Sequence, residues 1–195
     1  MSGPDLLRLG VLGSGYGSNL AAICRAIDQG VLPARIAAVL SDQPGARILE
    51  LGRTVGARTE CIVPGIARGR LDPATEEKLV AILREERVEL VILAGFMRII
   101  GPALLAAYPR RIINVHPSLL PNHRGAQAAA QALAAGDRMT GCTVHYVDQG
   151  VDTGEIIAQQ EVEVRPDDTA ETLQARIQVA EHALLPSVIA TFARP

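Results

Sequence analysis

Short apolar runs alternate with longer segments of helical periodicity along the first part of the chain. Apolar runs bounded by glycine or proline are typical of buried strands, and apolar residues at helical spacing are typical of amphipathic helices. The runs predict strands at 7–12, 35–40, 59–63, 90–94 and 111–115, and the periodic segments predict helices at 18–29, 46–55, 73–86 and 102–108. Because alternating strands and helices build a parallel sheet covered on both faces, we expect an α/β fold with three layers and an open, mostly parallel, Rossmann-like sheet.

The pattern changes in the last third of the chain. It predicts a helix at 126–135, strands at 142–147 and 156–164 joined by a turn at 150–154, and a long helix at 168–192. Asp168 and Glu171 have the spacing of a capping box at the start of the long helix. We therefore expect a small antiparallel C-terminal extension and a long C-terminal helix. No repeat or linker divides the sequence, so residues 1–195 are predicted to form a single domain.

The composition excludes several classes of partner. The 195 residues are 48% hydrophobic, which suffices for one sizeable core, and the net charge of −2 favours neither nucleic acid nor an anionic membrane. Cys24, Cys61 and Cys142 lie in apolar stretches without a C-x-x-C motif, which indicates buried, reduced thiols in a cytoplasmic protein. We expect no signal peptide and no membrane span, because the start is not basic and no apolar run reaches about 18 residues.

A glycine-rich loop at 13–19 follows the first predicted strand and opens the first helix. Unpaired backbone N–H groups at a helix N-terminus suit a phosphate, which predicts a monophosphate site at Gly17, Ser18 and Asn19. The loop lacks the lysine of a P-loop and the spacing of G-x-G-x-x-G. Two alternatives stay open: a dinucleotide site, with Asp42 as the ribose-binding acid, and a tight turn that binds no ligand.

Three polar residues are candidates for chemistry. Asn114 and His116 are two positions apart on a predicted strand, so their side chains share one face, and Asp152 lies in the turn at 150–154. A protonated His116 and the Asn114 amide can both donate hydrogen bonds to an oxyanion, and an adjacent Asp152 favours the imidazolium. Each also has a purely structural interpretation, as a strand cap, a satisfied core histidine and an ordinary turn acid.

No catalytic nucleophile or metal ligand set accompanies these three residues. Ser118 lacks a G-x-S-x-G elbow, and none of the four histidines has the H-x-x-x-H spacing of a zinc site. An amide, an imidazole and a carboxylate without a nucleophile suit direct attack of an outside amine on a carbonyl. The pattern therefore predicts an acyl or formyl transferase.

Four runs, at 14–20, 93–99, 114–121 and 151–154, occur in an order that resembles the folate-dependent phosphoribosylglycinamide formyltransferases of purine synthesis. The resemblance spans nearly the whole chain. It implies the formyltransferase fold, with 1–100 as the half that binds the nucleotide substrate and 101–195 as the catalytic, folate-binding half.

The resemblance implies a role for each substrate-binding residue. Gly17, Ser18 and Asn19 would hold the phosphate of glycinamide ribonucleotide. Gln178 and Glu181, three apart on one helix face, would contact the ribose or the glycinamide; their spacing alone would place them on a solvated face.

Folate contacts are implied for Asn114 and for two segments that would frame the pterin and read its polar edge through backbone groups. These segments consist of Met97, Arg98, Ile99, Ile100, Asp148, Gln149, Gly150, Val151 and Asp152. Asn114, His116 and Asp152 would be catalytic, with 10-formyltetrahydrofolate as co-substrate and no metal. The implied protein is a cytoplasmic monomer or homodimer whose partners are small molecules, with neither nucleic acid nor membrane among them.

Two positions depart from the family pattern. Either Arg68 or Arg70 matches the arginine with which relatives contact the folate. Arg124-Gly125 resembles the initiator-tRNA formyltransferases, which normally carry a basic C-terminal domain that this slightly acidic chain does not show. A formyltetrahydrofolate hydrolase, which uses water as acceptor and normally carries an extra N-terminal domain, is the other relative that shares this site.

Overall fold

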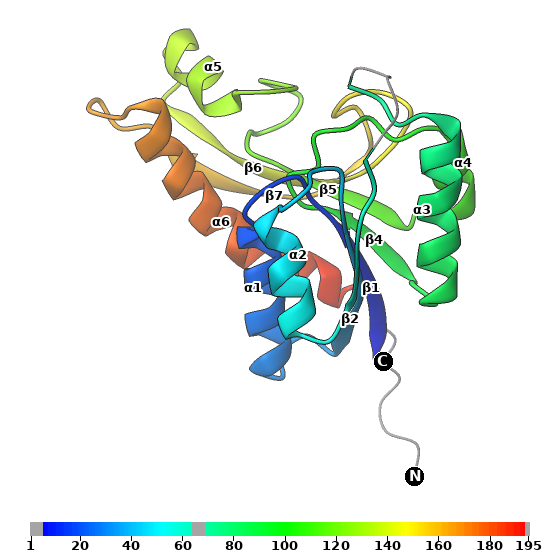
Figure 1. Ribbon diagram of the computed structural model, residues 1–195. Helices are drawn as coiled ribbons and strands as arrows, with labels where there is room; N and C mark the ends of the chain where they lie inside the picture. The colour runs from blue at the N-terminus through cyan, green and yellow to red at the C-terminus, as the bar shows by residue number, and fades with distance from the viewer. Residues whose placement is uncertain (1–5, 64–68, 194–195) are drawn as a thin grey trace.

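The computed structural model describes residues 6–63 and 69–193, which form a seven-stranded sheet with helices on both faces (Figure 1). The strands lie in the order β3-β2-β1-β4-β5-β6-β7. They are β1 (Leu7–Leu12), β2 (Ala34–Ser41), β3 (Arg58–Cys61), β4 (Leu90–Leu93), β5 (Ile112–His116), β6 (Met139–Tyr146) and β7 (Ile156–Glu163). The helices are α1 (Ser18–Asp28), α2 (Arg47–Thr54), α3 (Pro73–Glu85), α4 (Pro102–Ala107), α5 (Ala128–Ala135) and α6 (Ala170–Ala190).

The first five strands pair in parallel, β6 pairs antiparallel with β5, and β7 pairs antiparallel with β6. The central strand β4 is apolar and buried along its whole length because helices cover both of its faces. Helices α1, α2 and α6 cover one face and α3 and α4 the other (Figure 1). Leu20, Ile48 and Val188 belong to the core on the first face, and Leu83 and Leu104 to the core on the second. The expected three-layer α/β fold with an antiparallel extension and a long C-terminal helix is confirmed.

Several element boundaries differ from the sequence-based expectation. Helix α6 is capped by Thr169, whose hydroxyl accepts from the Thr172 N–H at 3.3 Å, so the expected capping box of Asp168 and Glu171 is wrong. Asp168 instead accepts from the Arg165 N–H at 2.7 Å and pairs with Arg176. Helix α5 begins two residues late, after Gln127 at a φ of 61°.

Strand β6 begins at Met139, three residues earlier than the apolar run at 142–147 suggests. Its first residues pair with the end of β7, Met139 opposite Glu163. Backbone pairing thus extends the strand beyond its apolar part. Within residues 6–63 and 69–193, no helix has the length and apolar character that a membrane crossing requires.

The sheet order reverses direction between β1 and β4. From β1 the chain builds outward through β2 and β3, and from β4 it builds outward the other way through β5. The loops that leave the carboxyl ends of β1 and β4 therefore diverge and leave a crevice between them, which is where open α/β sheets bind ligands.

Candidate active site

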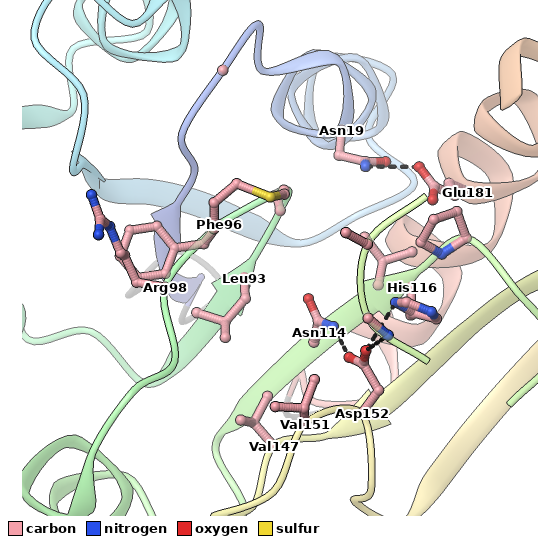
Figure 2. Close-up of a pocket in the computed structure, with 18 of the residues that line it drawn as sticks. Asn19, Leu93, Phe96, Arg98, Asn114, His116, Val147, Val151, Asp152 and Glu181 are labelled. Carbon is pink, nitrogen blue, oxygen red and sulfur yellow. Dashed lines mark hydrogen bonds and ion pairs between the residues drawn. The ribbon is translucent and has the colours of Figure 1, made fainter. Parts of the chain in front are cut away.

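A cavity of about 600 Å³ opens at this crevice. Its wall is formed by the glycine-rich loop after β1, the segment after β4, the end of β5, the turn between β6 and β7, and one face of α6 (Figure 2). Segments far apart in the sequence thus contribute to one site. The cavity contains nearly every residue for which the sequence predicted a functional role.

The glycine-rich loop delivers the N-terminus of α1 to the cavity. Gly17 caps the helix with a φ of 80°, and a Cβ there would lie 2.9 Å from the Ile48 side chain, so glycine is required. No side chain caps this helix, and its first turn contains no acidic residue. Because the first N–H groups of a helix have no partner within the helix, Ser18 and Asn19 present free donors and a partial positive charge. This end of the cavity is suited to a phosphate.

Asp42 does not lie in the cavity wall. Its side chain is 1% exposed, accepts a hydrogen bond from Ser14 Oγ at 2.5 Å, and pairs with Arg98 Nε at 2.7 Å. Ser14 and Arg98 therefore already bind the carboxylate oxygens to which the ribose of a dinucleotide would have to donate. This geometry argues against the dinucleotide alternative.

The amide, imidazole and carboxylate converge at the end of β5. Asn114 Nδ2 donates to Asp152 Oδ1 at 3.3 Å, and His116 Nδ1 lies 3.3 Å from Asp152 Oδ2 (Figure 2). Asp152 reaches them from the turn between β6 and β7, where its φ is 52°. A non-glycine residue in this left-handed region is uncommon, and here it aims the carboxylate into the cavity.

Asp152 is held as an anion. Burial by itself would raise the pKa of its carboxyl, but hydrogen bonds from His145 and from the Gly125 N–H at 2.9 Å, together with the nearby charge of His116, outweigh burial and lower the pKa below its usual value. His116 Nε2 lies 2.9 Å from the carbonyl oxygen of His123. Both ring nitrogens of His116 thus face acceptors, an arrangement that only the imidazolium satisfies completely.

His145 is a fourth member of this cluster that the sequence did not indicate. Its Nε2 lies 3.1 Å from Asn114 Nδ2 and 3.6 Å from Asp152 Oδ1. It stands directly opposite Asn114 in the antiparallel pairing of β5 and β6. Because that register is a tertiary feature, no local pattern around His145 could have identified it.

Glu181 and Gln178 enter the cavity from α6, as expected from the resemblance. Glu181 is 5% exposed, and Asn19 Nδ2 donates to its Oε2 at 3.0 Å (Figure 2). Burial raises the pKa of Glu181 to about 7, although the bond from Asn19 opposes the rise. The solvated face that spacing alone suggests is wrong for Glu181 and only partly right for the half-buried Gln178.

The two segments expected to frame a pterin lie in the cavity wall, with one exception. Residues 97–100 all line the cavity, as do Asp148 and residues 150–152, but Gln149 is exposed and lies outside the wall. Arg70 is exposed and does not line the cavity, and Arg68 lies outside the described residues. The described residues contain no group of histidine, cysteine and acidic side chains that could hold a metal ion.

Comparisons with known proteins agree on one family. A family model described as "Formyl transferase" matches residues 7–189. The chain is 42% identical to the phosphoribosylglycinamide formyltransferase of Bacillus subtilis (strain 168) over 182 residues, 93% of this chain and 92% of that protein. It is 40% identical over 189 residues to the trifunctional purine biosynthetic protein adenosine-3 of Drosophila melanogaster, with 94% of this chain matching 14% of that protein.

Solved structures show the same likeness. Glycinamide ribonucleotide transformylase 1 from Symbiobacterium toebii superposes with a TM-score of 0.91 at 43% identity, over 96% of this chain and 88% of that chain. Phosphoribosylglycinamide formyltransferase from Bacillus halodurans superposes with a TM-score of 0.89 at 40% identity, over 95% of this chain and 94% of that chain.

Proposed function

The chain belongs to the formyl transferase family, and from this premise we propose that it transfers the formyl group of 10-formyltetrahydrofolate to the amine of glycinamide ribonucleotide. The products are formylglycinamide ribonucleotide and tetrahydrofolate, in purine biosynthesis. One observation carries the proposal: an amide, an imidazole and a carboxylate converge in the same cavity as an uncapped helix N-terminus. The three polar groups suit acyl transfer without an enzyme nucleophile, and the helix N-terminus suits a phosphorylated acceptor.

The acceptor is assigned to the α1 end of the cavity. The N–H groups at Gly17, Ser18 and Asn19 are suited to the phosphate, and Glu181 and Gln178 lie close by on α6. Asn19 takes part in both sets of contacts, because its backbone N–H lies at the start of α1 and its side chain donates to Glu181. The amine of the bound nucleotide is then directed toward Asn114 and His116.

The formyl donor is assigned to the other end of the cavity. Residues 97–100, Asp148 and residues 150–152 form walls there, and Leu93, Val147 and Val151 add apolar surface (Figure 2). An apolar slot with exposed backbone polar groups at its edge suits a flat heteroaromatic ring. The same cavity thus has room and chemistry for two different small molecules.

Asn114, His116 and Asp152 each have a separate role in the reaction. As the amine nitrogen forms a bond to the formyl carbon, the carbonyl electrons move to oxygen, and Asn114 Nδ2 and His116 Nδ1 donate to that oxyanion. The contacts of these atoms with Asp152, at 3.3 Å each, are long enough for a substrate oxygen to compete for the same protons. Asp152 accepts the amine proton through a water, and the proton passes to the folate nitrogen as its bond to the formyl carbon breaks.

A direct spectrophotometric assay tests the function. Purified protein is mixed with 10-formyltetrahydrofolate, and the absorbance of the deformylated folate is followed with and without glycinamide ribonucleotide. We expect release of tetrahydrofolate only when the nucleotide is present. Equal release without any amine would identify a hydrolase, and formylation of initiator tRNA in preference to the nucleotide would identify the tRNA enzyme. We further propose that the protein acts in the cytoplasm as a monomer or homodimer.

A further inference from the structure

Asp42 is a buried charge that the proposed reaction does not use. It follows β2 directly, and its side chain is 1% exposed. Three side chains donate to its carboxylate: Ser14 Oγ at 2.5 Å, Gln43 Nε2 at 2.9 Å and Arg98 Nε at 2.7 Å. A carboxylate so completely occupied cannot bind a ligand, so its role must lie in the groups that it holds.

The charge of Asp42 is stable at neutral pH. Burial alone would raise the pKa of the carboxyl, but the hydrogen bonds from Ser14, Arg98 and Gln43 and the charge of Arg98 outweigh burial and lower it. The hydrogen bonds are therefore charge-assisted and stronger than bonds between neutral groups.

Two of the three donors attach Asp42 to the segment after β4. The hydroxyl of Ser14 has one hydrogen, which it gives to Asp42, and this leaves a lone pair that accepts the Met97 N–H at 2.9 Å. The next residue, Arg98, pairs with the carboxylate directly. Two consecutive residues of the segment at 97–100 are thus tied to one carboxylate.

We propose that Asp42 is a positioning residue for the folate: through Ser14 and Arg98 it holds the backbone at Met97 and Arg98 in the conformation that binds the pterin end of the co-substrate. This inference rests on the proposed function, because it assigns the segment at 97–100 to the folate. Asp42 does not line the cavity, so it acts only through these two partners.

The glycine-rich loop depends less on Asp42 than this segment does. The Gly13 N–H donates to the Leu40 carbonyl at 3.1 Å, and the Ser14 N–H to the Gly95 carbonyl at 3.0 Å. These backbone bonds remain when the carboxylate is removed. The N–H of Met97, in contrast, donates to the Ser14 hydroxyl, whose direction Asp42 sets. Loss of Asp42 should therefore weaken folate binding more than nucleotide binding.

Steady-state kinetics of Asp42→Asn and Ser14→Ala test the proposal. We expect each variant to raise the KM for 10-formyltetrahydrofolate about tenfold, as loss of a charge-assisted hydrogen bond does. The KM for glycinamide ribonucleotide and kcat should stay within about threefold, because Asn114, His116 and Asp152 lie outside this network. Gln43→Ala is the matched control: it removes a bond from the same carboxylate but neither link to the segment, and its folate KM should stay within about twofold.

The outcomes separate the inference from the proposed function. If the wild type transfers formyl groups and both variants keep its folate KM, the inference is overturned. A fall in kcat with both KM values unchanged shows that fewer molecules are folded and also overturns it. If the wild type transfers nothing, the proposed function fails, and titration with tetrahydrofolate then tests the inference. A Kd about tenfold weaker in the Asp42 and Ser14 variants supports the inference. Equal affinity in wild type and variants, or no binding by the wild type, overturns it.

Discussion

At the scale of the residue, the surroundings of Asp152 decide what His116 can do. The Asp152 carboxylate contacts both Asn114 and His116, and the His123 carbonyl takes the far nitrogen of the imidazole. A ring held between two acceptors is oriented before any substrate arrives. Such preorganised donors cost no reorganisation when negative charge develops on the substrate oxygen.

We expect His116→Ala and Asp152→Asn each to lower turnover at least about a hundredfold. An oxyanion donor such as His116 is typically worth about 10²–10³, and a general base such as Asp152 is typically worth about 10²–10⁴. The measurement is kcat in the folate absorbance assay, with melting temperature as a check on folding. Gln149→Ala is the control, since this exposed neighbour in the same turn lies outside the cavity wall. Near-wild-type turnover in a well-folded His116 or Asp152 variant would contradict the mechanism.

Glu181 makes stability depend on pH. Its folded pKa of about 7 lies above the ordinary 4.5, so between these values the native state binds more protons than the unfolded state, and stability falls as pH rises through this window. Among the described residues, the group that lowers the pKa of Glu181 is the neutral Asn19, so no cation there offsets the effect of burial.

Glu181→Gln removes the buried charge and should therefore stabilise the free protein at pH 8, by an amount on the order of a few kcal/mol at most, but not at pH 4 to 5. Thermal unfolding of both proteins at the two pH values measures this difference. Equal destabilisation of the variant at both pH values would show that the buried charge of Glu181 does not reduce the stability of the native protein.

At the scale of the element, local sequence located helices and strands well and their ends less well. The boundaries of α1, α2 and α3 were predicted within one residue, because glycines follow α1 and α2 and Pro73 opens α3. The start of α6 was assigned to Asp168 although Thr169 caps it. Adjacent Asp and Thr are both good N-cap residues, and only the backbone conformation distinguishes them.

Gly17 shows how one position shapes an element. Gly17→Ala places a side chain at a φ of 80° and within 3.1 Å of the Ile48 backbone, so we expect a loss of about 1–2 kcal/mol in stability and a higher KM for the nucleotide. Gly15→Ala is the control, because a Cβ at Gly15 meets no atom within 4 Å. Calorimetry and the nucleotide KM measure the two effects. Equal behaviour of the two variants would refute the assigned role of the α1 N-terminus.

At the scale of the whole molecule, the layers protect two of the three thiols. Cys24 and Cys142 are buried, and burial raises the pKa of both, whereas Cys61 is half-buried at the end of β3. We expect a disulfide reagent such as DTNB to label about one thiol quickly in the native protein and all three in urea. Rapid labelling of three thiols without denaturant would contradict the packing of α1 and β6.

The sequence alone determined the alternation of strands and helices, the glycine-rich turn that opens the helix after β1, and the shared face of Asn114 and His116. These features are local, because side-chain direction in a strand repeats every two residues and helix caps depend on neighbouring positions. Only the tertiary structure decided that Asp152 reaches this pair, that His145 stands opposite Asn114, and that Asp42 is occupied by Ser14 and Arg98. Strand register and the packing of distant loops depend on the whole sheet, and no short stretch of sequence contains that information.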